Sequence, residues 1–224
     1  MRKYALLRWT FVLVITTIPW IYLVSIWNSL PETIPVHFGI NGTPDKYGQR
    51  NEIFLWPAIC TALSILVYLL LTNIYKLDPK RSTPKLSGTF LKIAMVVVVF
   101  ISCITIILLS WTVKQHTIGL NLLLVMIGLL LAYVGNVMHS IKPNYFAGFR
   151  VPWTLESEEN WKATHLLGSK IWFGGGILIA ILALFIKPII MFFIMLGIVM
   201  VMLIIPTVYS YRMFARSKHT HNKL

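Results

Sequence analysis

The sequence has few charged residues and very few acidic ones. Charged residues make up 12% of the 224 residues, and seven acidic side chains stand against twenty basic ones. A soluble domain normally carries about 25% charged residues, so this composition excludes an ordinary soluble domain. Hydrophobic residues make up 57% of the chain. They lie in runs long enough to cross a hydrocarbon core, which takes ~20 residues in a helix.

Cysteine is scarce, and motifs for metal binding or catalysis are missing. Cys60 and Cys103 both fall in apolar runs, so we expect small hydrophobic side chains rather than a disulfide or a metal site. No Gly-x-Ser-x-Gly or His-Glu-x-x-His motif occurs, so we expect no enzyme and no cofactor. One alternative stays open, in which His139 or His165 and Glu158 or Glu159 form an acid–base site.

The histidines outside that combination do not predict a metal centre. His37 follows a short extended segment beside Phe38, and we expect it to pack on aromatic side chains. His219 and His221 lie in a basic tail, residues 212–224, that we expect to be short and mobile. Metal binding would need further ligands that the sequence does not supply.

Long apolar runs predict an all-α integral membrane protein with six transmembrane helices. The expected spans are residues 6–27, 56–75, 90–111, 118–137, 154–186 and 189–211. The first run is too long for a signal peptide, so we expect it to be retained. The sequence gives no sign of the oligomeric state.

The distribution of basic residues predicts the orientation. Sixteen of the twenty Lys and Arg residues lie in four segments, which are residues 1–8, 76–92, 138–170 and 212–224. The positive-inside rule therefore predicts that both termini face the cytoplasm. The formal charge of +13 is scattered over loops without a nucleic-acid-binding motif, so we expect no direct contact with nucleic acid.

Three segments follow from this pattern: residues 1–75 with the first loop, residues 76–137, and residues 138–224. The first loop, residues 29–54, faces outside in this orientation and is rich in proline and glycine. Asn41-Gly42 predicts a turn between short extended pieces, so the loop is expected to be ordered. Its candidate ligand-binding residues are Pro31, Pro35, His37, Phe38, Asn41, Gly42 and Asp45.

The central segment, residues 138–170, predicts a cytoplasmic loop followed by a helix. Pro143 and Pro152 exclude a continuous helix, and Gly148 permits an unusual backbone. Thr154 is the expected N-cap of a helix that enters the membrane without a break. Glu158 and Lys162 are spaced to pair. Trp161, His165, Gly168 and Trp172 are expected to share one face.

Two interpretations of this segment stay open on residue types alone. In the first it is an interfacial collar, in which Arg150 binds lipid phosphate or caps the fourth helix and the tryptophans lie among head groups. In the second it is a docking surface for a protein or peptide, with Arg and Trp as anchors.

The segment also resembles a known family. Asn136 to Trp161, centred on Gly148-Phe149-Arg150-Val151-Pro152-Trp153-Thr154-Leu155, resembles the C-terminal signature of the SdpI family of bacterial multi-span membrane proteins. Val151 stands where that family typically has Thr. The first loop, with Leu30-Pro31-Glu32-Thr33-Ile34-Pro35-Val36-His37-Phe38, resembles the N-terminal domain of unknown function that often precedes the signature.

The resemblance implies immunity to a secreted antimicrobial peptide toxin at the bacterial inner membrane. It also implies signalling, in which the protein holds a winged-helix repressor at the membrane. The implied partners are membrane lipids, the toxin outside and the repressor inside. The site residues carried by the signature are Asn136, Asn144, Gly148, Arg150, Pro152, Trp153, Thr154, Leu155, Glu159, Trp161 and His165. The alternative is a small-molecule or lipid transporter, although the spans contain almost no ionisable residues.

Overall fold

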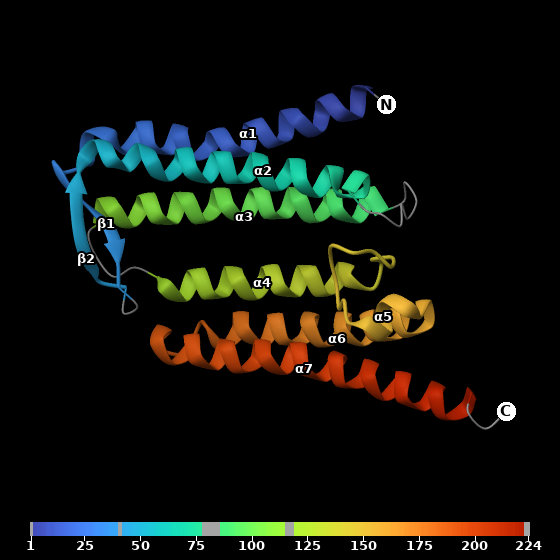
Figure 1. The fold of residues 1–224 in the computed structure, drawn as a ribbon. Helices are drawn as coiled ribbons and strands as arrows, with labels where there is room; N and C mark the ends of the chain where they lie inside the picture. Colours follow the sequence, from blue (N-terminus) through green and yellow to red (C-terminus); the bar gives the residue numbers. More distant parts are fainter. Residues whose placement is uncertain (1, 40–41, 78–85, 115–118, 222–224) are drawn as a thin grey trace. The chain divides into compact units, whose positions relative to one another are not determined.

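The computed structural model describes residues 2–39, 42–77, 86–114 and 119–221 (Figure 1). Within these ranges six helices are long and apolar enough to cross a membrane. They are α1 (Arg2–Ile26), α2 (Leu55–Leu77), α3 (Leu86–Lys114), α4 (Leu120–Met138), α6 (Glu158–Leu182) and α7 (Pro188–His221). The shorter elements are η1 (Trp27–Ser29), β1 (Thr33–Phe38), β2 (Pro44–Gln49), η2 (Arg50–Phe54) and α5 (Pro152–Glu156). The predicted all-α membrane fold is confirmed.

Large apolar side chains cover the outsides of these helices. Phe185 is 81% exposed, Val24 74% and Leu6 70%, and dozens of others resemble them. Water would not tolerate apolar patches of this extent, whereas lipid is an apolar solvent for them. The chain is a multi-pass membrane protein.

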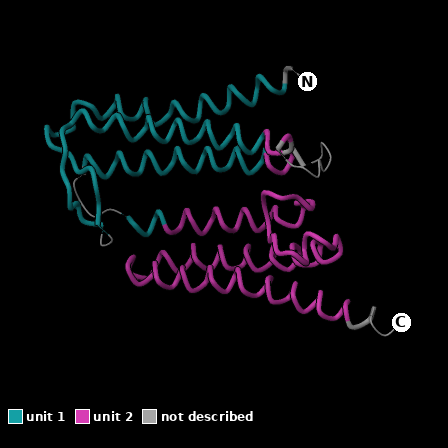
Figure 2. The backbone as a smooth tube through the Cα atoms, in the orientation of Figure 1, with its two compact units in different colours: residues 1–72, 91–123 teal, residues 73–90, 124–224 magenta. Residues whose placement is uncertain are grey.

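The helices group into two compact units (Figure 2). One unit contains residues 1–72 and 91–123, and the other contains residues 73–90 and 124–224. The units reflect packing, whereas the three segments expected from the sequence reflect motifs. That three-part division stays a prediction.

In the first unit, α1, α2 and α3 carry a hairpin that joins the end of α1 to the start of α2. Val12, Tyr68, Ala94 and Val98 form one buried cluster between the three helices. A second buried cluster anchors the hairpin, and its members are Leu23, Leu30, Ile34, Ile53 and Leu109. The strands β1 and β2 are antiparallel, with register shifts near His37. The predicted ordered loop is therefore a β-hairpin.

In the second unit, small residues let α4 and α6 approach closely. A Cβ on Gly128 would lie 2.7 Å from the carbonyl oxygen of Gly176 and 2.6 Å from the backbone nitrogen of Ala180. No side chain larger than hydrogen fits there, which is the close helix contact expected of small residues in membranes. Gly176 makes the same contact from the α6 side, because a Cβ on it would collide with the backbone nitrogen of Ala132.

A proline in α7 leaves a carbonyl that α6 satisfies. Pro206 lies inside the helix and has no N–H to donate to the carbonyl oxygen of Met202, four residues earlier. The indole Nε1–H of Trp172 in α6 donates to that oxygen at 3.1 Å. Lipid supplies no donor, so an unpaired carbonyl would be costly there. Trp172 therefore compensates for Pro206.

Two expected helix boundaries are wrong. The expected mobile tail is instead the end of α7, which continues as helix to His221. The helix expected to start at Thr154 is broken at Ser157, which separates α5 from α6. Ser157 caps α6 by accepting the Asn160 N–H at 3.2 Å. Pro152 at the first position of α5 explains the earlier start, because proline favours that position.

The pairing of Trp172 with Met202 predicts a conditional effect of mutation. Trp172→Phe keeps a ring but loses the donor, so it should destabilise the protein by about 0.6–1.7 kcal/mol. In a Pro206→Ala background the new backbone N–H can bond Met202, and the same substitution should cost less. Thermal unfolding of the purified protein measures both effects.

Trp20→Phe is the control, because Trp20 donates to Thr61 and not to a proline-freed carbonyl. Its cost should not depend on Pro206→Ala. An equal cost of Trp172→Phe in both backgrounds would contradict the assignment.

Candidate functional site

The signature loop, residues 139–151, is folded by its own buried polar groups. Asn144 is 2% exposed, and its Oδ1 accepts the backbone N–H groups of Phe146 and Ala147 at 2.8 Å each. Its Nδ2 donates to the carbonyls of Lys142 and Ala147. One side chain thus satisfies four backbone groups, which holds the turn in one conformation.

His165 in α6 joins this loop to the helix. The Trp161 carbonyl can only accept, so His165 Nδ1 carries the proton and donates to it at 2.8 Å. Nε2 then accepts the Phe149 N–H at 3.1 Å, which requires an uncharged ring. Gly148 has φ of 103° and touches this ring so closely that a Cβ would collide with Nε2. Only glycine fits here.

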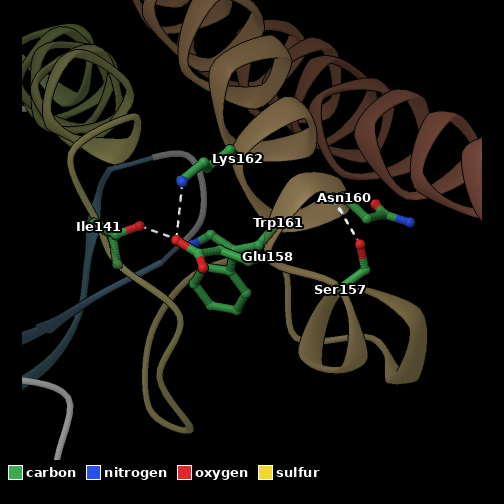
Figure 3. Close-up of polar contacts among 6 residues, drawn as sticks. All are labelled: Ile141, Ser157, Glu158, Asn160, Trp161 and Lys162. Carbon is green, nitrogen blue, oxygen red and sulfur yellow. Dashed lines mark hydrogen bonds and ion pairs between the residues drawn. The ribbon is translucent and has the colours of Figure 1, made fainter.

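Trp161 completes the interior of the signature. Its indole Nε1–H donates to the Ile141 carbonyl at 2.8 Å, as Figure 3 shows. Its ring stacks on His165 with centroids 4.0 Å apart. Trp161 is 1% exposed, so it neither lies among lipid head groups nor can anchor a partner directly.

The start of α6 is fastened to α7 by a second buried network. Asn160 Nδ2 donates to the Ser210 carbonyl at 3.0 Å, and Ser210 Oγ donates to Asn160 Oδ1 at 2.6 Å. Thr164 also donates to Asn160 Oδ1, at 2.9 Å. Glu158 and Lys162 form the predicted pair on the surface at 2.9 Å (Figure 3). Exposed pairs of this kind contribute little stability.

α5 packs on α7. The Trp153 ring lies 5.4 Å from that of Tyr211 and stacks on Phe214 at 6.1 Å between centroids. Thr154, expected as an N-cap, is 1% exposed and instead braces the turn. Its hydroxyl accepts the Val151 N–H at 3.1 Å and lies 2.7 Å from the Phe149 carbonyl, to which it donates.

The remaining signature residues face outward. We call Arg150, Pro152, Glu156 and Glu159, which are all exposed, the signature rim. The Arg150 guanidinium donates to the Tyr145 carbonyl within the loop, rather than capping the fourth helix. Asn136 is exposed on α4, and Leu155 is half-buried on α5.

The candidate residues of the hairpin likewise divide into buried and exposed ones. Pro35 is buried, Pro31 is half-buried, and the Phe38 ring packs against Trp111 and Trp56 with centroids 5.7 Å and 6.4 Å away. Gly42 occupies the turn, with φ of 77°, and Asn41 lies outside the described residues. His37 does not pack on aromatics as expected. It pairs with Asp45 at 2.6 Å, and both side chains are at least half exposed.

Sequence reasoning missed the residues that join the helices. Asn160 and Ser210 were not singled out, because one small polar residue in an apolar run can equally bond its own helix. Trp172 was expected on the shared helix face, but the carbonyl to which it donates was not predicted. Pro206 was the available signal, since a proline inside a span leaves a carbonyl to be satisfied.

The contact of Gly148 with His165 generates a second prediction. Gly148→Ala places a β carbon on the imidazole at a positive φ, so it should destabilise the second unit by about 1–3 kcal/mol. The melting temperature of the purified protein measures the loss. Gly174→Ala is the matched control, because a Cβ there meets nothing within 4 Å. Equal melting temperatures for the two variants would contradict the proposed fit.

Comparisons with known proteins match the two regions described above, the signature and the hairpin. A model of the SdpI/YfhL protein family matches residues 140–210, and a model of Domain of unknown function (DUF1648) matches residues 14–61. Immunity protein SdpI of Bacillus subtilis (strain 168) is 26% identical over 206 residues, which is 91% of this chain and 94% of that protein. An uncharacterized protein of Archaeoglobus fulgidus is 45% identical over 40 residues, which is 18% of this chain and 22% of that protein.

No solved structure matches the chain. The two family models coincide with the signature of the second unit and with the helix and hairpin of the first, and the Bacillus relative aligns across nearly all of both. The chain is therefore a multi-pass membrane protein that carries an SdpI/YfhL family region over residues 140–210 and a DUF1648 region over residues 14–61.

Proposed function

We propose that the chain is an immunity protein of the bacterial inner membrane that protects the cell against a secreted antimicrobial peptide toxin. The observation that carries this proposal is the alignment with Immunity protein SdpI, which covers 91% of this chain and 94% of the relative. A match of this extent includes both the hairpin and the signature. A shared single motif would support much less.

Charge and helix number support the orientation that we propose. Sixteen of the twenty basic residues lie in segments that an arrangement with both termini inside places in the cytoplasm. If each of the six helices crosses once, the hairpin after α1 and the signature after α4 face opposite sides. The hairpin is then outside, where a secreted peptide arrives, and the signature is inside.

The signature rim has the features expected of a cytoplasmic docking surface. Arg150 and the glutamates Glu156 and Glu159 present both signs of charge on a turn braced by buried hydrogen bonds. Prior ordering of a surface lowers the cost of binding. We therefore propose the signature rim as the place where a winged-helix repressor is held.

The role we propose is non-enzymatic. Of the candidate acid–base residues, His165 is 1% exposed, whereas His139 is exposed. The Nδ1 and Nε2 atoms of His165 are both engaged by backbone groups. A transporter is not favoured either, because the spans contain few ionisable residues.

Deletion of the gene tests protection directly. We expect cells without it to survive challenge with the cognate peptide toxin less well, because no protein remains to intercept the toxin. A plasmid copy of the full chain should restore survival. Unchanged survival of the deletion strain would refute immunity.

Substitution of Arg150 tests the docking surface separately. Arg150→Ala should lower repressor binding by roughly 30-fold, as expected for an arginine that contributes ~2 kcal/mol to an interface. Protection from the toxin should persist, because the hairpin is unchanged. Co-purification of the repressor from membranes measures the binding.

Lys142→Ala is the matched control, because it also removes one exposed cation from the same loop. It should leave repressor binding unchanged. Equal retention of the repressor by Arg150→Ala and the wild type would exclude Arg150 from the dock.

A further inference from the structure

A groove of about 330 Å³ runs along one face of α7 and against α6. Five of its lining residues come from α7, and Leu167 comes from α6. The lining is Leu167, Ile204, Ile205, Val208, Tyr209 and Arg212. The α7 residues follow one another at helical spacing, so they form a single stripe.

The length of this stripe matches one leaflet. From Ile204 to Arg212 the helix rises eight residues, which is ~12 Å at ~1.5 Å per residue. Half of a hydrocarbon core is ~15 Å thick. If Arg212 lies at the level of the head groups, the apolar part of the groove reaches most of the way to the middle of the bilayer.

Polarity along the groove changes in one step. Its inner part is aliphatic, whereas Tyr209 and Arg212 stand together at the end nearest the C-terminus. Arg212 is exposed, and no acidic side chain among the described residues forms an ion pair with it. Tyrosine is common at the membrane interface, and arginine binds phosphate oxygens in a bidentate manner.

Hydrogen bonds on the buried side of α7 fix the wall of the groove. Ser210, between Tyr209 and Arg212 in the sequence, is fully buried and exchanges hydrogen bonds with Asn160 of α6 at 2.6 Å and 3.0 Å. The spacing of the two helices is thereby fixed at this level. The groove is therefore already ordered before a ligand binds.

We propose that the groove binds one acyl chain of an anionic phospholipid, with the lipid phosphate paired to Arg212. The aliphatic part fits a hydrocarbon chain, and the lone cation at its outer end fits an anionic head group. The chain's formal charge of +13 also favours anionic lipids nearby. This inference concerns a lipid site and does not depend on immunity.

Native mass spectrometry of the full-length protein in detergent tests the site. The probes are phosphatidylglycerol, which is anionic, and phosphatidylcholine, which is zwitterionic, titrated into the same preparation. The wild type should retain phosphatidylglycerol preferentially. Arg212→Gln should lower that retention about tenfold, as expected for the loss of a charge-assisted contact.

Arg216→Gln is the matched control, because it removes the same charge one turn further along α7, outside the groove lining. It should retain phosphatidylglycerol as the wild type does. Equal losses in the two variants would show that the basic end of α7 attracts lipid without a site, and would overturn the proposal.

Val208→Trp tests the apolar part without a change of charge. It fills the groove, so it should lower retention of both lipids, with an unaltered melting temperature confirming the fold. Undiminished retention in this variant would place the acyl chain elsewhere. Displacement of phosphatidylglycerol by inorganic phosphate alone would reduce the site to an ion site and contradict the proposal.

Discussion

Lipid offers a peptide group no hydrogen-bond partner, and this constraint determines the rest of the structure. It requires helices, and it makes an unpaired backbone group within a helix costly unless another group satisfies it. Pro206 leaves such a group at the Met202 carbonyl, and Trp172 satisfies it. The same hydrogen bond ties α6 to α7. The need to satisfy backbone groups in lipid thus influences which helices pack together.

The signature extends this principle to the membrane surface. Its buried side chains, among them Asn144, Thr154 and His165, bond almost entirely to backbone groups of the loop and the adjoining helix. They fix the backbone so that other residues, such as Arg150, are presented outward. A family signature can therefore contain more supporting residues than contacting ones. Burial separates the two kinds here, which residue type alone could not do.

The sequence predicted the parts of the fold that depend on composition. Runs of apolar residues locate the spans, because lipid selects for them directly. Helix ends in water depend on competing caps, and both Thr154 and Ser157 could serve; Pro152 starts a separate short helix and leaves the capping of α6 to Ser157. The environment of His37 could not be predicted, because its partner Asp45 depends on the hairpin register. Binding by the predicted site residues stays a prediction.

The orientation we propose places the hairpin and the signature rim on opposite sides of the membrane, with lipid around the six helices. Labelling of single cysteines tests it, in a background where Cys60 and Cys103 are replaced by alanine. Lys46→Cys lies on β2 and Glu159→Cys lies in the signature rim, both at exposed positions. A membrane-impermeant maleimide should label Lys46→Cys in intact protoplasts and Glu159→Cys only after permeabilisation. Labelling of both positions in intact protoplasts, or of Glu159→Cys alone, would contradict the account.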